Sequence, residues 1–121
     1  ANSRKAIESQ VKLIRARTKY ADVQPAFLEE TPLIADCYEA TDVRNIVVVP
    51  FFISNGLHTI EDIPVLLGEP EARVKDRLAA GQPTWRNPTE RSGKLVWYTE
   101  AIGSEPRLSD VILERVREAV R

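Results

Sequence analysis

The chain has 121 residues, enough for one domain with a single hydrophobic core. Its 17 basic and 18 acidic residues nearly balance, so the composition predicts neither nucleic acid nor an anionic membrane as a partner. No apolar segment approaches the roughly 20 residues that cross a bilayer. The only cysteine, Cys37, cannot form an internal disulfide, fits a reducing compartment and is best interpreted as a small buried hydrophobe. We therefore expect a cytoplasmic protein whose residues 1–121 form one domain.

Segments typical of helices and of strands alternate along the chain. In order, the pattern predicts a helix at 3–17, a strand at 22–28, a helix at 32–40, a strand at 45–53, helices at 62–67 and 70–80, a loop at 82–93, a strand at 94–102 and a last amphipathic helix with Leu108, Ile112, Val116 and Val120 on one face. Pro25 lacks a backbone donor, so the first strand should lie at a sheet edge. The alternation predicts an α/β fold, a three-layer sandwich in which helices flank a parallel sheet.

The predicted order of elements suggests that a strand is missing at the start. The chain begins directly with a helix, whereas an α/β unit normally opens with a strand that leads into that helix. Three strands also make a thin sheet for the helices that must cover it. We therefore expect Ala1 to lie inside a domain whose first strand is absent.

The only histidine, His58, lies where such folds place their chemistry. Residues 45–53 form an apolar run rich in β-branched side chains, typical of a strand buried on both faces, and His58 follows in the loop after it. Glu29 and Glu30 follow the 22–28 strand in the same way, so parallel strands would bring a carboxylate and an imidazole to one cleft. This pair suits a divalent transition metal or general base catalysis.

Structural interpretations of the same residues remain open. His58 could be a solvated loop residue, and Glu29 and Glu30 could favour the dipole of the helix predicted at Pro32. Glu61 and Asp62 could cap the next helix. The sequence contains no G-x-S-x-G, G-x-G-x-x-G or P-loop motif and no Cys/His cluster, so serine hydrolase, dinucleotide enzyme and zinc-finger interpretations lack support.

The run VVVPFFISNGLHTIEDIP, residues 47–64, resembles the second signature of the class II sirohydrochlorin chelatases, which include the cobaltochelatases of cobalamin biosynthesis. The segment AFLEETP at 26–32 is similar to the Phe-Leu-Glu segment of that family. The segment WYTEAIGSEP at 97–106 is similar to its last strand, with the glycine before the final helix. The three segments occur in the family's order and cover most of the chain.

The resemblance implies a lyase that inserts Co²⁺, or Fe²⁺ or Ni²⁺ as in relatives, into a tetrapyrrole such as sirohydrochlorin, without an organic cofactor. His58 matches the family's second histidine and Glu29 its acidic residue, so both are expected to be catalytic and to contact the metal. The residues expected to bind the macrocycle are Phe51, Phe52, Asn55, Gly56 and Leu57. A flat polyanionic ring also calls for a cleft with apolar walls and some cationic rim. Family members often pair subunits or domains, which leaves a homodimer or a partner domain as an alternative.

The chain departs from the family at its start. Members begin with a strand that ends in His-Gly-Ser/Thr, whereas this chain begins ANSRKAIESQ and has no second histidine. The family fold places that strand between the predicted 22–28 and 45–53 strands, so a vacant or partner-filled strand position is expected there. Three interpretations follow: a chelatase domain, a non-catalytic structural or partner-binding domain of the same fold, or an unrelated α/β enzyme with His58 as a base.

Overall fold

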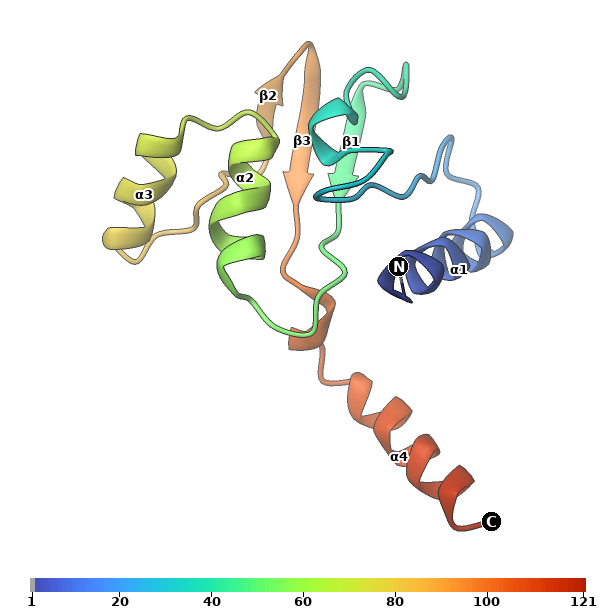
Figure 1. The fold of residues 1–121 in the computed structure, drawn as a ribbon. Helices are drawn as coiled ribbons and strands as arrows, with labels where there is room; N and C mark the ends of the chain where they lie inside the picture. Colours follow the sequence, from blue (N-terminus) through green and yellow to red (C-terminus); the bar gives the residue numbers. More distant parts are fainter. Residues whose placement is uncertain (1) are drawn as a thin grey trace.

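The computed structural model describes residues 2–121, with side chains from residue 4 onward, and shows an α/β fold around a small sheet (Figure 1). The helices and strands are α1 (Asn2–Arg17), β1 (Asn45–Val48), α2 (Ile63–Leu66), α3 (Glu71–Ala79), β2 (Thr89–Arg91), β3 (Lys94–Tyr98) and α4 (Leu108–Ala119). Shorter helical turns are η1 (Ile34–Asp36), η2 (His58–Asp62) and η3 (Ile102–Ser104). The predicted α/β class is confirmed.

The sheet is mixed rather than parallel, with strand order β1-β3-β2. β1 pairs with β3 in parallel, with Val47 opposite Trp97, whereas β2 runs antiparallel to β3. The loop predicted at 82–93 is therefore wrong at its end, because Thr89–Arg91 forms β2. Ser92 and Gly93 join β2 to β3 with positive φ angles of 51° and 75°, which a two-residue hairpin turn requires.

The core lies on one face of the sheet only. On that face Val96 and Tyr98 of β3 pack with Ile63 and Leu67 and with Ile34 of η1. On the other face the side chains of Val47 and Val49 are 62% and 54% exposed, so the prediction that 45–53 is buried on both faces is wrong. The physical reason is visible in Figure 1, where α1 lies beside β1 and α4 extends away from the sheet instead of covering it.

Residues 22–40 form neither of the two elements predicted for them. The N–H of Phe27 donates to the carbonyl of Pro32 (2.8 Å), and the N–H of Ile34 donates to the carbonyl of Phe27 (3.0 Å). These bonds close a loop. They occupy the N–H and carbonyl of Phe27, which a strand at 22–28 would use, and the carbonyl of Pro32, which an α-helix from Pro32 would use. The strand is therefore absent, and only the short turn η1 replaces the helix. Since residues 22–28 form no strand, the strand position expected between them and β1 remains a prediction.

The other predicted helices are confirmed. α2 and α3 end as expected before Gly68 and Gly81, whose φ angles of +106° and +68° favour glycine. α4 forms where the last amphipathic helix was predicted, and its apolar side chains Val111, Ile112 and Val116 are at least half exposed. No helix among the described residues is long and apolar enough to cross a membrane.

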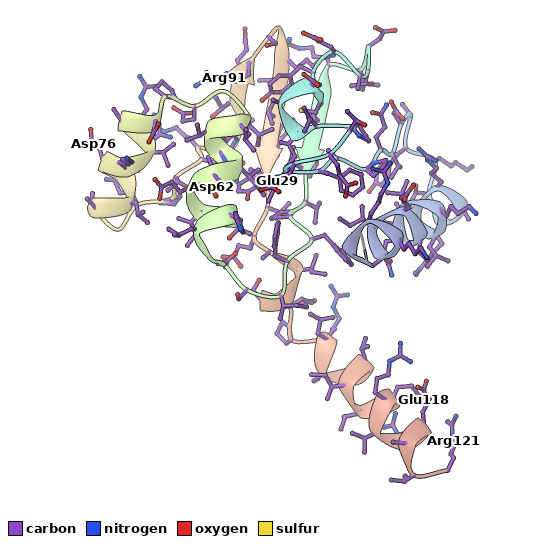
Figure 2. The ribbon with its side chains drawn as sticks, in the orientation of Figure 1. Glu29, Asp62, Asp76, Arg91, Glu118 and Arg121 are labelled. Carbon is purple, nitrogen blue, oxygen red and sulfur yellow. The ribbon has the colours of Figure 1, made fainter. Side chains whose placement is uncertain are left out.

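A buried carboxylate joins the helices to the hairpin. The side chain of Glu69, 1% exposed, pairs with Arg73 (3.2 Å) and Arg77 (3.6 Å) of α3 and with Arg91 (3.0 Å) of β2. Figure 2 shows Arg91 at the end of β2 next to the hairpin turn. Because a buried charge needs partners to offset its desolvation, this cluster fixes the turn between α2 and α3 against β2.

Cys37 follows η1 in a turn rather than lying within a helix. Its half-buried side chain packs against the core cluster, as expected for a small hydrophobe. Burial raises the pKa of the Cys37 thiol above its ordinary value. The thiol is therefore less ionised near neutral pH than an exposed cysteine would be.

Two phenols, those of the buried Tyr98 and of the half-buried Tyr38, bind the segment formed by η2 and α2. The hydroxyl of Tyr98 donates to the backbone carbonyl of Thr59 (2.6 Å), and the hydroxyl of Tyr38 donates to that of Leu67 (2.6 Å). Burial raises the pKa of both tyrosines above their ordinary value of about 10. The phenols therefore stay protonated, as donors, over a wider pH range in the folded chain than in the unfolded chain.

The chain that leaves β1 is fixed by a close contact with η3. The N–H of Gly103 donates to the carbonyl of Phe52 (3.0 Å), and a Cβ atom at position 103 would lie 1.4 Å from the carbonyl oxygen of Ile53. Only glycine allows this approach of the two backbones. The approach determines where residues 50–53, and with them Phe52, lie.

We predict that Tyr98→Phe lowers the free energy of unfolding by about 1 kcal/mol at neutral pH, because the Thr59 carbonyl loses its donor. The raised pKa of Tyr98 adds stability that is fully present below about pH 10 and is lost as the pH rises further, because the unfolded phenol ionises first. The variant should therefore lose stability less steeply at alkaline pH. Urea unfolding at several pH values measures this, with Tyr20→Phe (Tyr20 is 73% exposed) as the control. An alkaline profile identical to that of the wild type would contradict the prediction.

We also predict that Gly103→Ala destabilises the fold by roughly 1–3 kcal/mol, because the added methyl group collides with the Ile53 carbonyl. Gly56→Ala is the matched control, since a Cβ atom there meets nothing within 4 Å. Thermal unfolding of both variants measures the difference. Equal melting temperatures for the two variants would show that the backbone approach is not a constraint.

Candidate functional site

His58 begins a π-helical turn at the carboxyl-end side of β1. The carbonyl of Gly56 accepts hydrogen bonds from the N–H groups of Thr59 (3.1 Å) and Ile60 (2.9 Å), and the N–H of Ile63 donates to the carbonyl of His58. This wide turn replaces the loop predicted between β1 and the next helix. Such turns occur often at functional sites, where they displace a side chain from regular helical register.

Two side chains hold the imidazole of His58. Its Nδ1 atom lies 2.9 Å from Oδ2 of Asp62, and its ring stacks on that of Phe52 with centroids 5.9 Å apart and an interplanar angle of 29°. His58 and Asp62 are both on η2, whereas Phe52 comes from the chain after β1. The side chain of His58 is nevertheless 61% exposed, so it remains accessible to a ligand.

His58 and Glu29 line the same open pocket, of about 340 Å³. Figure 2 shows Glu29 next to the α2 ribbon, with Asp62 on the adjoining turn. The side chains that line this pocket are those of Leu28, Glu29, His58, Glu61, Asp62, Val65, Leu66 and Glu71. The predicted meeting of a carboxylate and the imidazole is thus observed, although Glu29 reaches the pocket from the loop closed by Phe27 and not from the end of a strand.

The charge of this pocket is acidic. Its lining holds four carboxylates and one imidazole but no lysine or arginine, and one of those carboxylates, Glu71, pairs with Lys75 (3.0 Å) outside the pocket. The cationic rim expected for a polyanionic ring is therefore not part of this pocket. Clustered carboxylates attract a divalent cation, so the electrostatics favour metal over the macrocycle here.

The five residues expected to bind the macrocycle lie outside the lining of the pocket. Phe51 and Leu57 are 38% and 67% exposed, and Phe52 stacks on His58. Asn55 accepts a hydrogen bond from the N–H of Ala101 (3.1 Å), so its side chain connects the chain after β1 to η3. The carbonyl of Gly56 accepts the first hydrogen bonds of η2.

The helix-dipole interpretation of Glu29 and Glu30 and the capping interpretation of Asp62 are wrong. No α-helix begins at Pro32, so Glu29 has no helix dipole to favour, and Glu30 instead pairs with Arg4 (3.3 Å). Asp62 directly precedes α2 but makes no capping hydrogen bond with its side chain. It contacts His58, a role that the sequence analysis missed, although the i,i+4 spacing of the two residues was a signal.

The described residues hold no group of three or more His, Cys, Asp or Glu side chains placed to bind a metal ion together. Glu29, His58 and Asp62 share a pocket, yet their donor atoms do not converge on one point. A metal ion in this pocket would therefore use His58 with at most one further side chain as the structure stands.

Comparison with known proteins agrees with the resemblance in the sequence. The model of the CbiX family matches residues 1–119. A protein of Halobacterium salinarum named probable sirohydrochlorin cobaltochelatase is 39% identical over 118 residues, which are 98% of this chain and 38% of that protein.

Two further relatives are named sirohydrochlorin cobaltochelatase. That of Methanopyrus kandleri is 29% identical over 98% of this chain and 87% of its own length. That of Methanothermobacter thermautotrophicus is 35% identical over 67% of this chain and 55% of its own length. The chain thus spans little more than a third of the Halobacterium relative and most of the Methanopyrus one. Since the family model covers nearly the whole sequence, the chain belongs to the CbiX family.

Proposed function

We propose that this domain inserts a divalent metal ion, Co²⁺ in the first instance, into a tetrapyrrole of the sirohydrochlorin type. The observation that carries the proposal is the pocket that Glu29 and His58 line together. The names of the relatives support the reaction, since each names sirohydrochlorin and cobalt. Fe²⁺ and Ni²⁺ also bind imidazole ligands and are the alternative metal substrates.

The chemistry of metal insertion matches the side chains of the pocket. A hydrated metal ion must lose water while two pyrrole N–H protons leave the ring. The neutral imidazole of His58 can bind the ion through one nitrogen, and the carboxylate of Glu29 can accept a proton or offset positive charge. Because a single imidazole holds the ion loosely, the ion can also leave for the ring nitrogens. A tighter site would compete with the product.

The macrocycle would lie against the apolar side chains next to this pocket. Phe51 and Leu57 are exposed and belong to the same loop as His58, so we assign them the contact with the ring. Phe52 supports His58 from the side, while Asn55 and Gly56 set the path of the loop. These five residues would then bind the substrate partly by contact and partly by shaping the loop.

The three-layer sandwich is also part of the proposal. The exposed valines Val47 and Val49 form an apolar strip on the face opposite α2, and exposed apolar surface of this kind is unfavourable in water. A second helical layer would bury that strip. A homodimer or a partner domain would bury it equally well.

A non-catalytic role is the second candidate. The observation that favours it is that the donor atoms of the described residues do not converge into a metal site of three or more ligands. A structural domain of this family would keep the fold and the pocket without turnover. The two candidates make different predictions for His58 and Glu29.

We predict that His58→Ala abolishes most Co²⁺ insertion and leaves the fold intact. The side chain is 61% exposed, so its removal should change the free energy of unfolding by no more than about 0.5 kcal/mol. Insertion is followed by the absorbance change of sirohydrochlorin and stability by thermal unfolding. Equal insertion rates in wild type and variant would remove His58 from the mechanism and favour the non-catalytic role.

We predict that Glu29→Gln lowers the insertion rate by about two orders of magnitude, the scale of a positioned acid–base group. Glu30→Gln is the matched control, because the neighbouring Glu30 pairs with Arg4 instead of lining the pocket. The control should keep the wild-type rate. Comparable losses in both variants would mean that the general negative charge of this loop matters and not the position of Glu29.

A further inference from the structure

We propose that Asp62 is a positioning residue that fixes the tautomer and the orientation of His58, so that Nε2 is the atom that meets the metal. This inference rests on the proposed function, because it assigns a direction to the histidine through which that function would operate. It starts from the 2.9 Å contact between Nδ1 of His58 and Oδ2 of Asp62.

The contact determines which ring nitrogen carries the proton. A neutral imidazole has one N–H donor and one acceptor nitrogen, whereas an ionised carboxylate only accepts. The short contact therefore requires a hydrogen on Nδ1, which leaves the lone pair of Nε2 free. Free histidine in water favours the opposite tautomer, so Asp62 selects the form in which Nε2 can bind a cation. Carboxylate partners orient metal-binding histidines in the same way in other proteins.

The backbone keeps the two side chains at this distance. His58 and Asp62 are the first and last residues of η2, and two side chains from outside the turn bind its backbone carbonyls. The hydroxyl of Tyr98 donates to Thr59, and the hydroxyl of Thr84 donates to Ile60. The turn is thus attached to β3 and to the chain after α3, so the spacing of His58 and Asp62 does not depend on η2 alone.

The ring of Phe52 restricts the imidazole from a second direction. It stacks on His58 with an interplanar angle of 29°, which limits rotation of the ring away from Asp62. The hydrogen bond and the stacking together leave the Nε2 edge as the free edge of the ring. Glu29, Glu61 and Glu71 line the same pocket and so place further negative charge around a cation bound there.

The role of Asp62 is orientation rather than stability. Its side chain is 49% exposed and that of His58 is 61% exposed, and such exposed pairs contribute little to folding. Removal of the carboxylate should consequently change the state of the imidazole much more than the melting temperature. This difference separates a positioning role from a structural one.

The tautomer can be measured directly because His58 is the only histidine of the chain. In protein labelled with [¹⁵N]histidine, both ring-nitrogen NMR signals come from His58, so no residue assignment is needed. The spectra are recorded at about pH 8.5, where an imidazole group is in general mainly neutral. The wild type should show the Nδ1–H form. Asp62→Ala should shift the population toward the Nε2–H form. Asp62→Asn keeps a neutral hydrogen-bond acceptor, so its population of the Nδ1–H form should lie between those of the wild type and Asp62→Ala.

Co²⁺ affinity is the second readout. We expect Asp62→Ala to bind Co²⁺ roughly 10–100-fold more weakly than the wild type, the range for loss of a partner of a metal-binding histidine. Asp62→Asn should lose less. Asp76→Asn, a change of the same charge on α3 away from the pocket, is the control and should bind as the wild type does (Figure 2). Melting temperatures of all three variants should stay close to that of the wild type.

The outcomes separate this inference from the proposed function. An unchanged tautomer in Asp62→Ala, or equal Co²⁺ affinities of Asp62→Asn and Asp62→Ala, would overturn the positioning role, since charge alone would then explain the effect. The proposed function would stand if the wild type still inserted Co²⁺ into sirohydrochlorin. If the wild type shows the Nδ1–H form but never inserts metal, the geometry of Asp62 is upheld and the chelatase proposal fails.

Discussion

The hydrogen bond from the Tyr98 hydroxyl to the Thr59 carbonyl is the interaction on which the candidate site depends. π-Helical turns are rare, and in η2 the carbonyls of Thr59 and Ile60 accept hydrogen bonds from the hydroxyls of Tyr98 and Thr84. Tyr98 comes from β3, the central strand, and connects η2 directly to the core. Tyr38 does the same at the far end of α2 through the Leu67 carbonyl. The candidate site at the surface is therefore positioned by two phenols that lie in the core or pack against it.

The acidic lining of the pocket affects a metal ion and an anionic ring in opposite ways. Carboxylates around His58 raise the local concentration of cations, and in the proposed reaction the same charges would repel a ring that carries carboxylates of its own. Under that proposal, the metal ion and the polyanionic macrocycle would approach from different sides of the loop. Phe51 and Leu57 present apolar surface outside the lining of the acidic pocket. This arrangement would keep the ion separate from the ring until both are in place.

The sequence predicted the strand–turn–helix unit around His58 because strong local signals agreed there. A β-branched run gave β1, and glycines gave the ends of α2 and α3. The strand at 22–28 failed because the competing bonds between Phe27, Pro32 and Ile34 join residues that no periodic pattern connects. The contact of Asp62 with His58 arises from a turn wider than an α-helix, whose geometry follows from tertiary contacts. Membership of the CbiX family removes the interpretation as an unrelated α/β enzyme.

The environment of Cys37 allows local opening of the structure to be followed by labelling its thiol. The thiol is half-buried against the core, and the next residue, Tyr38, holds the Leu67 carbonyl at the end of α2. A thiol reagent should react with Cys37 more slowly than with an exposed cysteine, because burial raises the pKa of the thiol and limits access to it, and opening of this region should speed the reaction. Since no other cysteine exists in the chain, a change in the rate of labelling reports a change in how often this region opens. Dynamics next to the candidate site can thus be followed in the native sequence, without an engineered label.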